Sequence, residues 1–300
     1  VSQPVDITMV GKLNGDGGDL SALMRERGRI VGRMKAALSP SEGGTGSWSE
    51  QLFAAPLSGG LRYNGPASAL FSFAGLAGQH LEGPLAIAAD VSGRLDAPRL
   101  TGVVKANSLV YENETFGTRI ADLRLDGRFT NTDFVLNQMA GRAGEGTVSA
   151  SGRASLSAED GYPIDLSVTM DNAQLAEGEG ISARVSGDLN IVNGPNRPAS
   201  ISGTLTLPEA RYRIVRQGGE EIAELAGVRR RPVSLESVEN AAGEEEEAVP
   251  PSDWNLDIDI RADNRIFVTG MGLESEWQMD LNVGGTASDY RVRGELEILR

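Results

Sequence analysis

Cysteine is absent from this 300-residue chain, histidine occurs once, and aromatic residues make up only 5%. A chain without cysteine cannot form a disulfide scaffold or a cysteine-ligated zinc or iron–sulfur site. Basic residues are also scarce, with 28 Lys and Arg against 42 Asp and Glu, and the net charge is −14. Because nucleic-acid binding depends on clustered Lys and Arg, this composition argues against nucleic acid as a partner. No run of 18 apolar residues occurs, so the sequence predicts no membrane-spanning helix.

Residue sets that carry catalysis or bind metals are equally scarce. His80 lies near no Gly-x-Ser-x-Gly motif, and the chain has no Gly-x-x-x-x-Gly-Lys-Ser/Thr phosphate loop. Asp257, Asp259 and Asp263 lack the glycine and the terminal glutamate of an EF-hand loop. We interpret His80 as a surface histidine and the aspartates as water-facing residues. The sequence therefore predicts a protein that is not an enzyme and that has no metal and no cofactor.

The dominant pattern is the alternation of apolar and polar residues with a period of two, which is typical of half-buried strands. Ile164, Leu166 and Val168, for example, alternate with polar residues, and similar runs occur around 123–129, 256–260 and 277–283. Gly, Asn, Asp and Pro separate the runs, as turns require. We therefore predict an all-β protein of about 16 strands, each about seven to ten residues long, in one elongated, open, solenoid-like stack.

Glycines mark an internal repeat. Two tripeptides end in glycine, at Gly93 and at Gly285. In each case a second glycine follows nine residues later, at Gly102 and at Gly294. A third copy begins at 185–187 and reaches position 203 after a longer connection. Because each copy contains several strands, the repeat favours a stack of equivalent strand sets.

Two short helices are predicted, near 19–27 and near 67–76. Asp19 can cap the first, and Leu20, Leu23 and Met24 follow at helical spacing, whereas Gly28 disfavours its continuation. Residues 217–252 break the strand pattern with three arginines at 229–231, four glutamates at 244–247 and two prolines at 250–251. We predict a continuous β-groove segment over 1–216, a charged flexible insertion over 217–252, and a continuation of the groove over 253–300.

The apolar strand faces are the candidate binding surface. In a closed sandwich they would pack on one another as an ordinary core, whereas in a one-sided stack they would line a hydrophobic trough able to hold an acyl chain. The pattern alone leaves both readings open. The candidate lipid-groove residues are Leu123, Leu125, Phe129, Ile164, Leu166, Val168, Leu205, Leu207, Leu256, Ile258, Ile260, Met279, Leu281, Leu296 and Ile298.

Several stretches resemble the TamB family of Gram-negative envelope proteins, of the alphaproteobacterial type. Residues 83–102 resemble the repeated strand–turn pattern of that family, and residues 111–118 are similar to it as well. The most specific stretch is 264–277, which is followed by Val283-Gly284-Gly285. The resemblance covers nearly the whole chain and is weakest before Gly28 and over 217–252. Because the chain opens and stops within the strand pattern, we interpret it as a piece of a longer protein.

The resemblance implies a long, bent β-sheet called a β-taco, with a greasy groove and no catalytic residues. It implies a periplasmic protein that is anchored in the inner membrane outside this chain and that reaches toward TamA, a β-barrel in the outer membrane. The implied function is passive movement of phospholipid, whose acyl chains lie in the groove. The alternative is a chaperone or scaffold that helps outer-membrane β-strands to fold by pairing at an exposed sheet edge.

Overall fold

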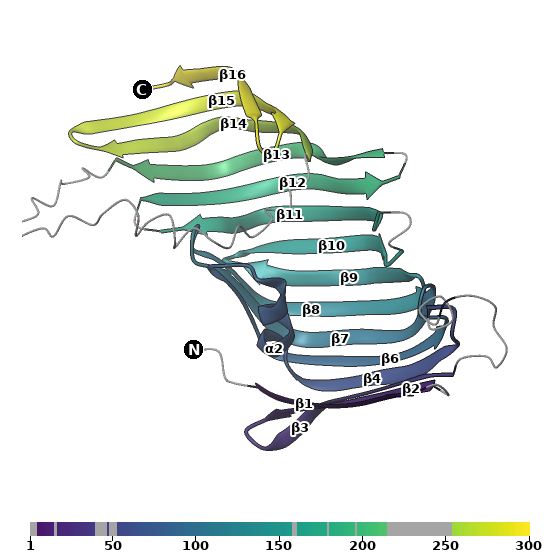
Figure 1. Ribbon diagram of the computed structural model, residues 1–300. Coiled ribbons are helices and arrows are strands. Elements are labelled where there is room, and N and C mark those ends of the chain that lie inside the picture. The colour runs from purple at the N-terminus through teal and green to yellow at the C-terminus, as the bar shows by residue number, and fades with distance from the viewer. Residues whose placement is uncertain are drawn as a thin grey trace, which may run out of the picture.

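The computed structural model describes residues 5–14, 17–39, 47, 53–157, 161–178, 180–195, 197–214 and 254–300. These residues form one sheet of sixteen strands, and Figure 1 shows the strands stacked one after another from the N-terminal to the C-terminal end. The helices whose bounds the structure describes are α2 (Ala67–Phe71) and the 3-10 helix η1 (Ser72–Ala74). The prediction of a single open all-β stack is confirmed.

The strands lengthen toward the middle and the C-terminal part of the sheet. β13 has 17 residues, so the expected length of seven to ten is too short for these strands. The strands are β1 (Val5–Asn14), β2 (Gly17–Glu26), β3 (Arg29–Leu38), β4 (Leu57–Pro66), β5 (Gln79–Glu82), β6 (Pro84–Gly93), β7 (Pro98–Asn113), β8 (Thr118–Asn131), β9 (Asp133–Ala143), β10 (Gly146–Ser155), β11 (Ile164–Glu177), β12 (Ile181–Gly194), β13 (Arg197–Arg213), β14 (Asn255–Gly270), β15 (Leu273–Thr286) and β16 (Tyr290–Ile298).

Almost every strand pairs antiparallel with the strand before it in the sequence. β5 and β6 pair with successive parts of β7, and together they cover most of its length. β13 and β14 form the one parallel pair among the described strands, with Ser200 opposite Asn255 and Arg213 opposite Thr269. The insertion predicted over 217–252 separates these two strands in the sequence and lies outside the described residues.

The helix predicted near 19–27 is wrong, because this segment forms β2. Leu20, Ala22 and Met24 follow one another with a period of two and share a face of the sheet, paired on one side with β1 and on the other with β3. The backbone N–H and C=O groups of β2 form hydrogen bonds with strands on both sides, and this pairing outweighs the local helical signal that begins at Asp19. The second predicted helix, near 67–76, corresponds to α2 and η1.

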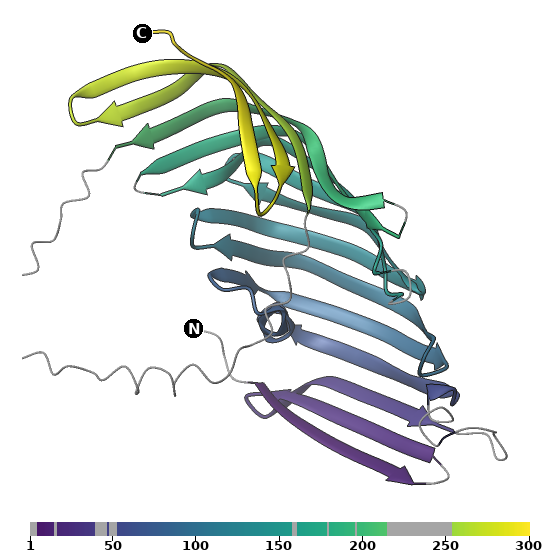
Figure 2. The ribbon, with the colours of Figure 1, turned by 45° about the horizontal axis from the view of Figure 1, so that its top comes forward.

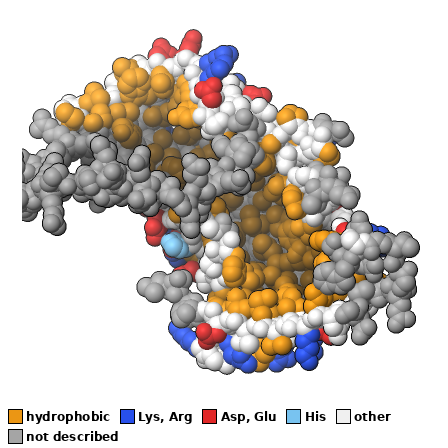
Figure 3. Space-filling model, in the orientation of Figure 1, with side chains coloured by type: hydrophobic (Ala, Val, Ile, Leu, Met, Phe, Trp, Pro, Cys, Tyr) orange, Lys and Arg blue, Asp and Glu red, His pale blue; other side chains and the backbone are white. Residues whose placement is uncertain are grey.

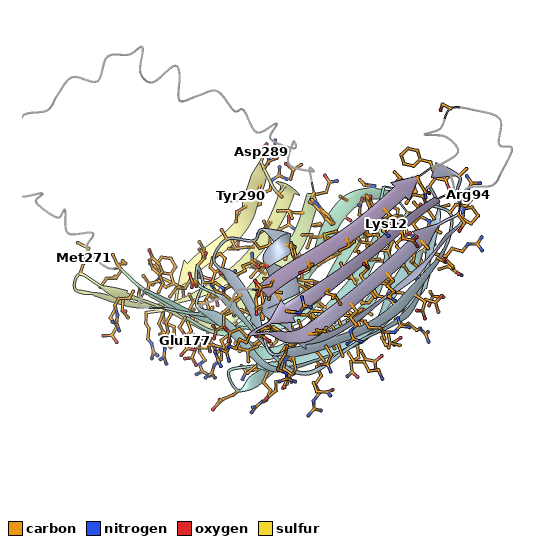
Figure 4. The ribbon with its side chains drawn as sticks, turned by 60° about the horizontal axis from the view of Figure 1, so that its bottom comes forward. Lys12, Arg94, Glu177, Met271, Asp289 and Tyr290 are labelled. Carbon is orange, nitrogen blue, oxygen red and sulfur yellow. The ribbon has the colours of Figure 1, made fainter. Side chains whose placement is uncertain are left out.

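The sheet has two chemically different faces. Residues that pair across neighbouring strands lie on the same face, so the register traces each face from strand to strand. One face, here called the inner face, is apolar, and the other, the outer face, carries most of the charged and polar side chains, as the sticks beneath the sheet in Figure 4 show. On the outer face, Ser167 donates a hydrogen bond to Asn190 at 3.0 Å and Thr169 donates one to Asp188 at 2.7 Å.

Glycines on the inner face let the long strands bend. Gly187 has a φ of 136°, and a Cβ atom there would lie 2.1 Å from the carbonyl oxygen of Thr204. Gly294 has a φ of 141°, and its Cβ atom would lie 2.0 Å from the carbonyl oxygen of Asp280. Only a residue without a side chain permits such close backbone approach, which curves the sheet instead of ending its strands. Figure 2 shows the resulting bent and twisted stack.

Candidate functional site: an open apolar groove

The pairing register brings the apolar runs of all strands onto the inner face. One row of paired residues shows this continuity across β10 to β16. The row consists of Ala150, Val168, Leu189, Gly203, Ile258, Val283 and Val292. Because each neighbour in the row is also apolar or glycine, the inner face presents an unbroken hydrophobic path perpendicular to the strands.

The structure places all fifteen candidate residues on this inner face. Leu207 is placed there by its spacing from Leu205, just before a bulge in β13, and the other fourteen are placed by direct pairing or by alternation within a paired run. The fifteen are Leu123, Leu125 and Phe129 on β8; Ile164, Leu166 and Val168 on β11; Leu205 and Leu207 on β13; Leu256, Ile258 and Ile260 on β14; Met279 and Leu281 on β15; and Leu296 and Ile298 on β16. Their contact with lipid remains a prediction.

The inner face is open rather than covered by a second layer. Of the fifteen candidates only Leu123 is buried, while Leu296 and Ile298 are 59% and 58% exposed and the others are half-buried. Leu109 is the one large side chain that is fully buried among the described residues. In an ordinary packed core most of these aliphatic side chains are buried. Figure 3 shows the face directly, as a hollow lined by hydrophobic side chains.

Alternation within the predicted runs missed several residues of this groove. The register adds residues of every strand from β1 to β7, β9, β10 and β12, including Met34, Leu61, Leu136, Met139 and Ile191. In the first half of the chain, alanine and glycine interrupt the apolar runs, which weakens the period-two signal. The pairing of adjacent strands identifies these positions, because each sits opposite an apolar neighbour.

Helix α2 packs against part of the inner face. Its first residue, Ala67, is fully buried against Ala106, Leu109 and Leu123 on β7 and β8. The backbone N–H of Ala67 donates a hydrogen bond to the carbonyl oxygen of Gly83 at 2.7 Å. The excursion between β4 and β5 therefore covers the groove over β7 and β8.

Tyr63 on β4 fixes the start of this excursion. Its hydroxyl donates a 2.6 Å hydrogen bond to the carbonyl oxygen of Pro66, the residue that precedes α2. The side chain is 3% exposed, and burial, with a smaller contribution from the negative charge of Glu26, raises the pKa of Tyr63 from 10.0 to about 12. The phenol thus stays protonated and serves as a donor.

The polar groups near the groove are satisfied by neighbours. Ser275 is buried on the inner face, donates to the carbonyl oxygen of Val268 at 3.2 Å, and accepts a hydrogen bond from the indole of Trp277 at 2.9 Å. The groove wall can therefore carry a serine and an indole without an unpaired buried polar atom, which would weaken binding of hydrocarbon.

The residues considered as catalytic or metal candidates have structural partners. His80 pairs with Glu114 at 3.1 Å on the surface. Asp257 and Asp259 lie on the outer face and accept hydrogen bonds from the amide of Asn282 at 3.2 and 2.9 Å. Across the residues with a described placement, no group of three or more His, Cys, Asp or Glu side chains is arranged to hold a metal ion.

The sheet ends in two exposed edge strands. All nine residues of β16 are exposed, and so are all residues of β1 after Val5. Their inner-face side chains, such as Met9 and Leu296, extend the apolar surface to both edges. Among the described residues, the apolar surface thus extends from β1 to β16.

The two long sides of the groove are formed by the turns between strands. In Figure 4, Met271 and Glu177 lie at one set of strand ends and Lys12 and Arg94 at the opposite set. We name these sides the Met271 rim and the Arg94 rim. The rims bear charged residues, so the apolar inner face is bounded by groups that prefer water.

Comparison with known families agrees with this architecture. The family model of the TamB C-terminal domain matches residues 137–300, which is more than half of the chain. The chain belongs to the TamB family. TamB proteins are transport and bridge proteins of outer-membrane biogenesis rather than enzymes; they span the periplasm from an inner-membrane anchor and act with a TamA-like partner.

Neither the curated proteins nor the solved structures include a match to this TamB chain. Within the described residues, no helix is both long and apolar enough to cross a membrane.

Proposed function

We propose that this chain is a periplasmic segment of a TamB protein and conducts phospholipid between the inner and the outer membrane. The observation that carries the proposal is the apolar inner face, which continues across the strands and is open to solvent except where α2 covers it over β7 and β8. The acyl chains lie against this face, and the headgroups remain in water at a rim. A TamA-like β-barrel, contacted largely by regions outside this chain, is the proposed partner at the outer membrane.

The chemistry of the face suits movement rather than tight capture. Each CH₂ that leaves water for an apolar surface is favoured by about 0.8 kcal/mol, and the same gain is available at every strand along the row. The acyl chain needs no hydrogen bond, and none of the aliphatic side chains offers one. A uniform apolar surface holds hydrocarbon strongly against loss to water while leaving small barriers between neighbouring positions.

The decisive experiment places a charge on the inner face and compares it with a charge on the outer face. Leu166 and Ser167 are adjacent on β11, pair with different residues of β12, and face opposite sides. Leu166→Asp puts a carboxylate on the lipid path, whereas Ser167→Asp adds the same charge to the polar side of the same strand. We expect the first to abolish lipid passage and the second to leave it unchanged.

The readouts are photocrosslinking to lipid in cells and the integrity of the outer membrane. A photoreactive amino acid at Ile258 should crosslink lipid, and one at the neighbouring outer-face position Asp257 should not. Circular dichroism of both Asp variants checks that the sheet is still folded. Lipid crosslinking at neither position, together with a normal outer membrane in a folded Leu166→Asp variant, would refute the conduit.

The exposed edges favour a second candidate function, a chaperone or scaffold for outer-membrane β-strands. An edge strand offers unpaired N–H and C=O groups that can add a further strand. Val292→Pro and Val292→Thr on β16 test this idea, because proline removes a backbone donor while threonine keeps it. If the edge captures strands, only the proline variant should lose binding of an unfolded barrel peptide.

A further inference from the structure

A hollow of about 360 Å³ lies at the Met271 rim, where the starts of β12 and β15 meet the ends of β13 and β14. Its lining comes from both faces of the sheet. Ile181 and Tyr212 pair across β12 and β13 on the inner face and are 43% and 54% exposed. Arg211 and Arg213 alternate with Tyr212 and therefore lie on the outer face. Most of the lining therefore belongs to the charged outer face, and Ile181 and Tyr212 are the inner-face residues that border the hollow at this rim.

Two guanidinium groups line the charged side of the hollow. Arg211 is held by an ion pair with Glu209 at 2.8 Å and lies over the ring of Phe267, 5.8 Å from its centroid. Glu209 also pairs with Arg265, so its charge is shared between two arginines. Arg213 forms no ion pair with any residue of known placement. The positive charge of Arg213 is therefore available to bind an anion.

A carboxylate lies on the same outer-face row as Arg213. Arg213 pairs with Thr269 on β14, and Thr269 pairs in turn with Glu274 on β15, so the two charges are two strands apart, about 10 Å between backbones. Glu274 lines the hollow and has no ion pair with a described residue, whereas Glu276, one row away, is neutralised by Arg300 at 2.7 Å. The hollow therefore presents a cationic and an anionic group on the same outer-face row, with β14 between them.

We propose that this hollow binds the zwitterionic phosphoethanolamine headgroup of a phospholipid whose acyl chains cross Ile181 and Tyr212 onto the inner face. Guanidinium groups form charge-assisted hydrogen bonds with phosphate oxygens, and the carboxylate of Glu274 accepts hydrogen bonds from the primary ammonium. A quaternary choline head has no N–H to donate to Glu274, so this carboxylate favours the primary ammonium of ethanolamine. This inference rests on the proposed conduit and specifies the headgroup of the phospholipid that the conduit carries.

The test measures lipid retained by the whole 300-residue chain, by native mass spectrometry, after incubation with detergent-solubilised lipids that have identical acyl chains. The lipids are phosphatidylethanolamine, phosphatidylglycerol and diacylglycerol. Wild-type protein should prefer phosphatidylethanolamine. Arg213→Gln should lower its retention about tenfold, as the loss of one charge-assisted contact predicts, while diacylglycerol is unaffected.

Glu274→Gln separates the two charges of the headgroup. It should remove the preference for phosphatidylethanolamine over phosphatidylglycerol, because only the ammonium contact is lost. Arg291→Gln is the matched control, since Arg291 pairs with Asp289 on the Arg94 rim, away from the hollow. It should change neither retention nor preference, and circular dichroism should show all three variants folded.

The outcomes distinguish this site from the conduit itself. If wild-type protein retains no lipid, including diacylglycerol, the conduit fails. If it retains phosphatidylethanolamine and diacylglycerol equally, or if Arg213→Gln and Glu274→Gln change nothing, the headgroup site fails while the conduit stands. Inorganic phosphate should not compete, and loss of the lipid preference in its presence would show a general phosphate site instead.

Discussion

An open groove and a packed core differ in what a leucine deletion costs, and the two leucines at the extremes of exposure on the inner face measure this difference. Leu109 is 1% exposed beneath α2, whereas Leu296 on β16 is 59% exposed. Replacing a fully buried leucine with alanine removes its transfer free energy and leaves a cavity, which together cost about 3 to 5 kcal/mol. Replacing a leucine that water already reaches leaves no cavity, so Leu296→Ala should cost about 0.5 kcal/mol or less.

Urea unfolding followed by circular dichroism measures both free energies. We expect the midpoint to fall clearly for Leu109→Ala and to stay near the wild-type value for Leu296→Ala. Lipid binding should show the opposite order, with a larger loss for Leu296→Ala than for Leu109→Ala. Leu296 belongs to the exposed surface that hydrocarbon contacts, whereas Leu109 is covered by α2. Comparable losses of stability in the two variants would mean that the inner face is packed against another layer, and the groove would have to be abandoned.

Three further outcomes follow from single contacts. Tyr63→Phe removes the hydrogen bond to Pro66 and should lower the free energy of unfolding by about 1 to 2 kcal/mol in the same urea assay, against no change for Tyr290→Phe on the exposed edge. Folding raises the pKa of Tyr63 from 10.0 to about 12, so its contribution to the free energy of unfolding is complete below about pH 10 and is lost as the pH rises through 12. The loss is on the order of 2 kcal/mol, and the Tyr63→Phe variant should not show it. Gly294→Ala should destabilise the β15–β16 pairing, because the added Cβ meets the carbonyl oxygen of Asp280; hydrogen exchange of β16 as slow as in the wild type would contradict this.

Alternation determined the strand faces from sequence alone. A strand turns successive side chains to opposite sides, so the run Ile164, Leu166 and Val168 needed no tertiary information to be assigned to one face. The same holds for the turn at Gly93, which recurs at Gly285. Their φ angles are 95° and 91°, and each is followed by a turn closed by the same pair of backbone hydrogen bonds.

The local sequence pattern gave a wrong prediction where pairing with neighbouring strands determined the structure. Residues 19–27 have helical spacing, but β1 and β3 pair with this segment on both sides and make it a strand. The third proposed copy of the repeat fails for a related reason. Gly187 lies in the middle of β12 opposite Leu205, where it permits close backbone approach rather than a turn.

The sequence by itself determined that this protein is a stack of amphipathic strands, because period-two patterning and turn residues are local properties. Only the tertiary structure decided that the apolar faces join into one open surface. That outcome depends on the register between strands, on glycines that let backbones approach, and on α2, which covers the inner face only around β7 and β8 and the neighbouring β5. Likewise, Arg213 and Glu274 are 61 positions apart in the chain, and only the parallel pairing of β13 with β14 places them on one row.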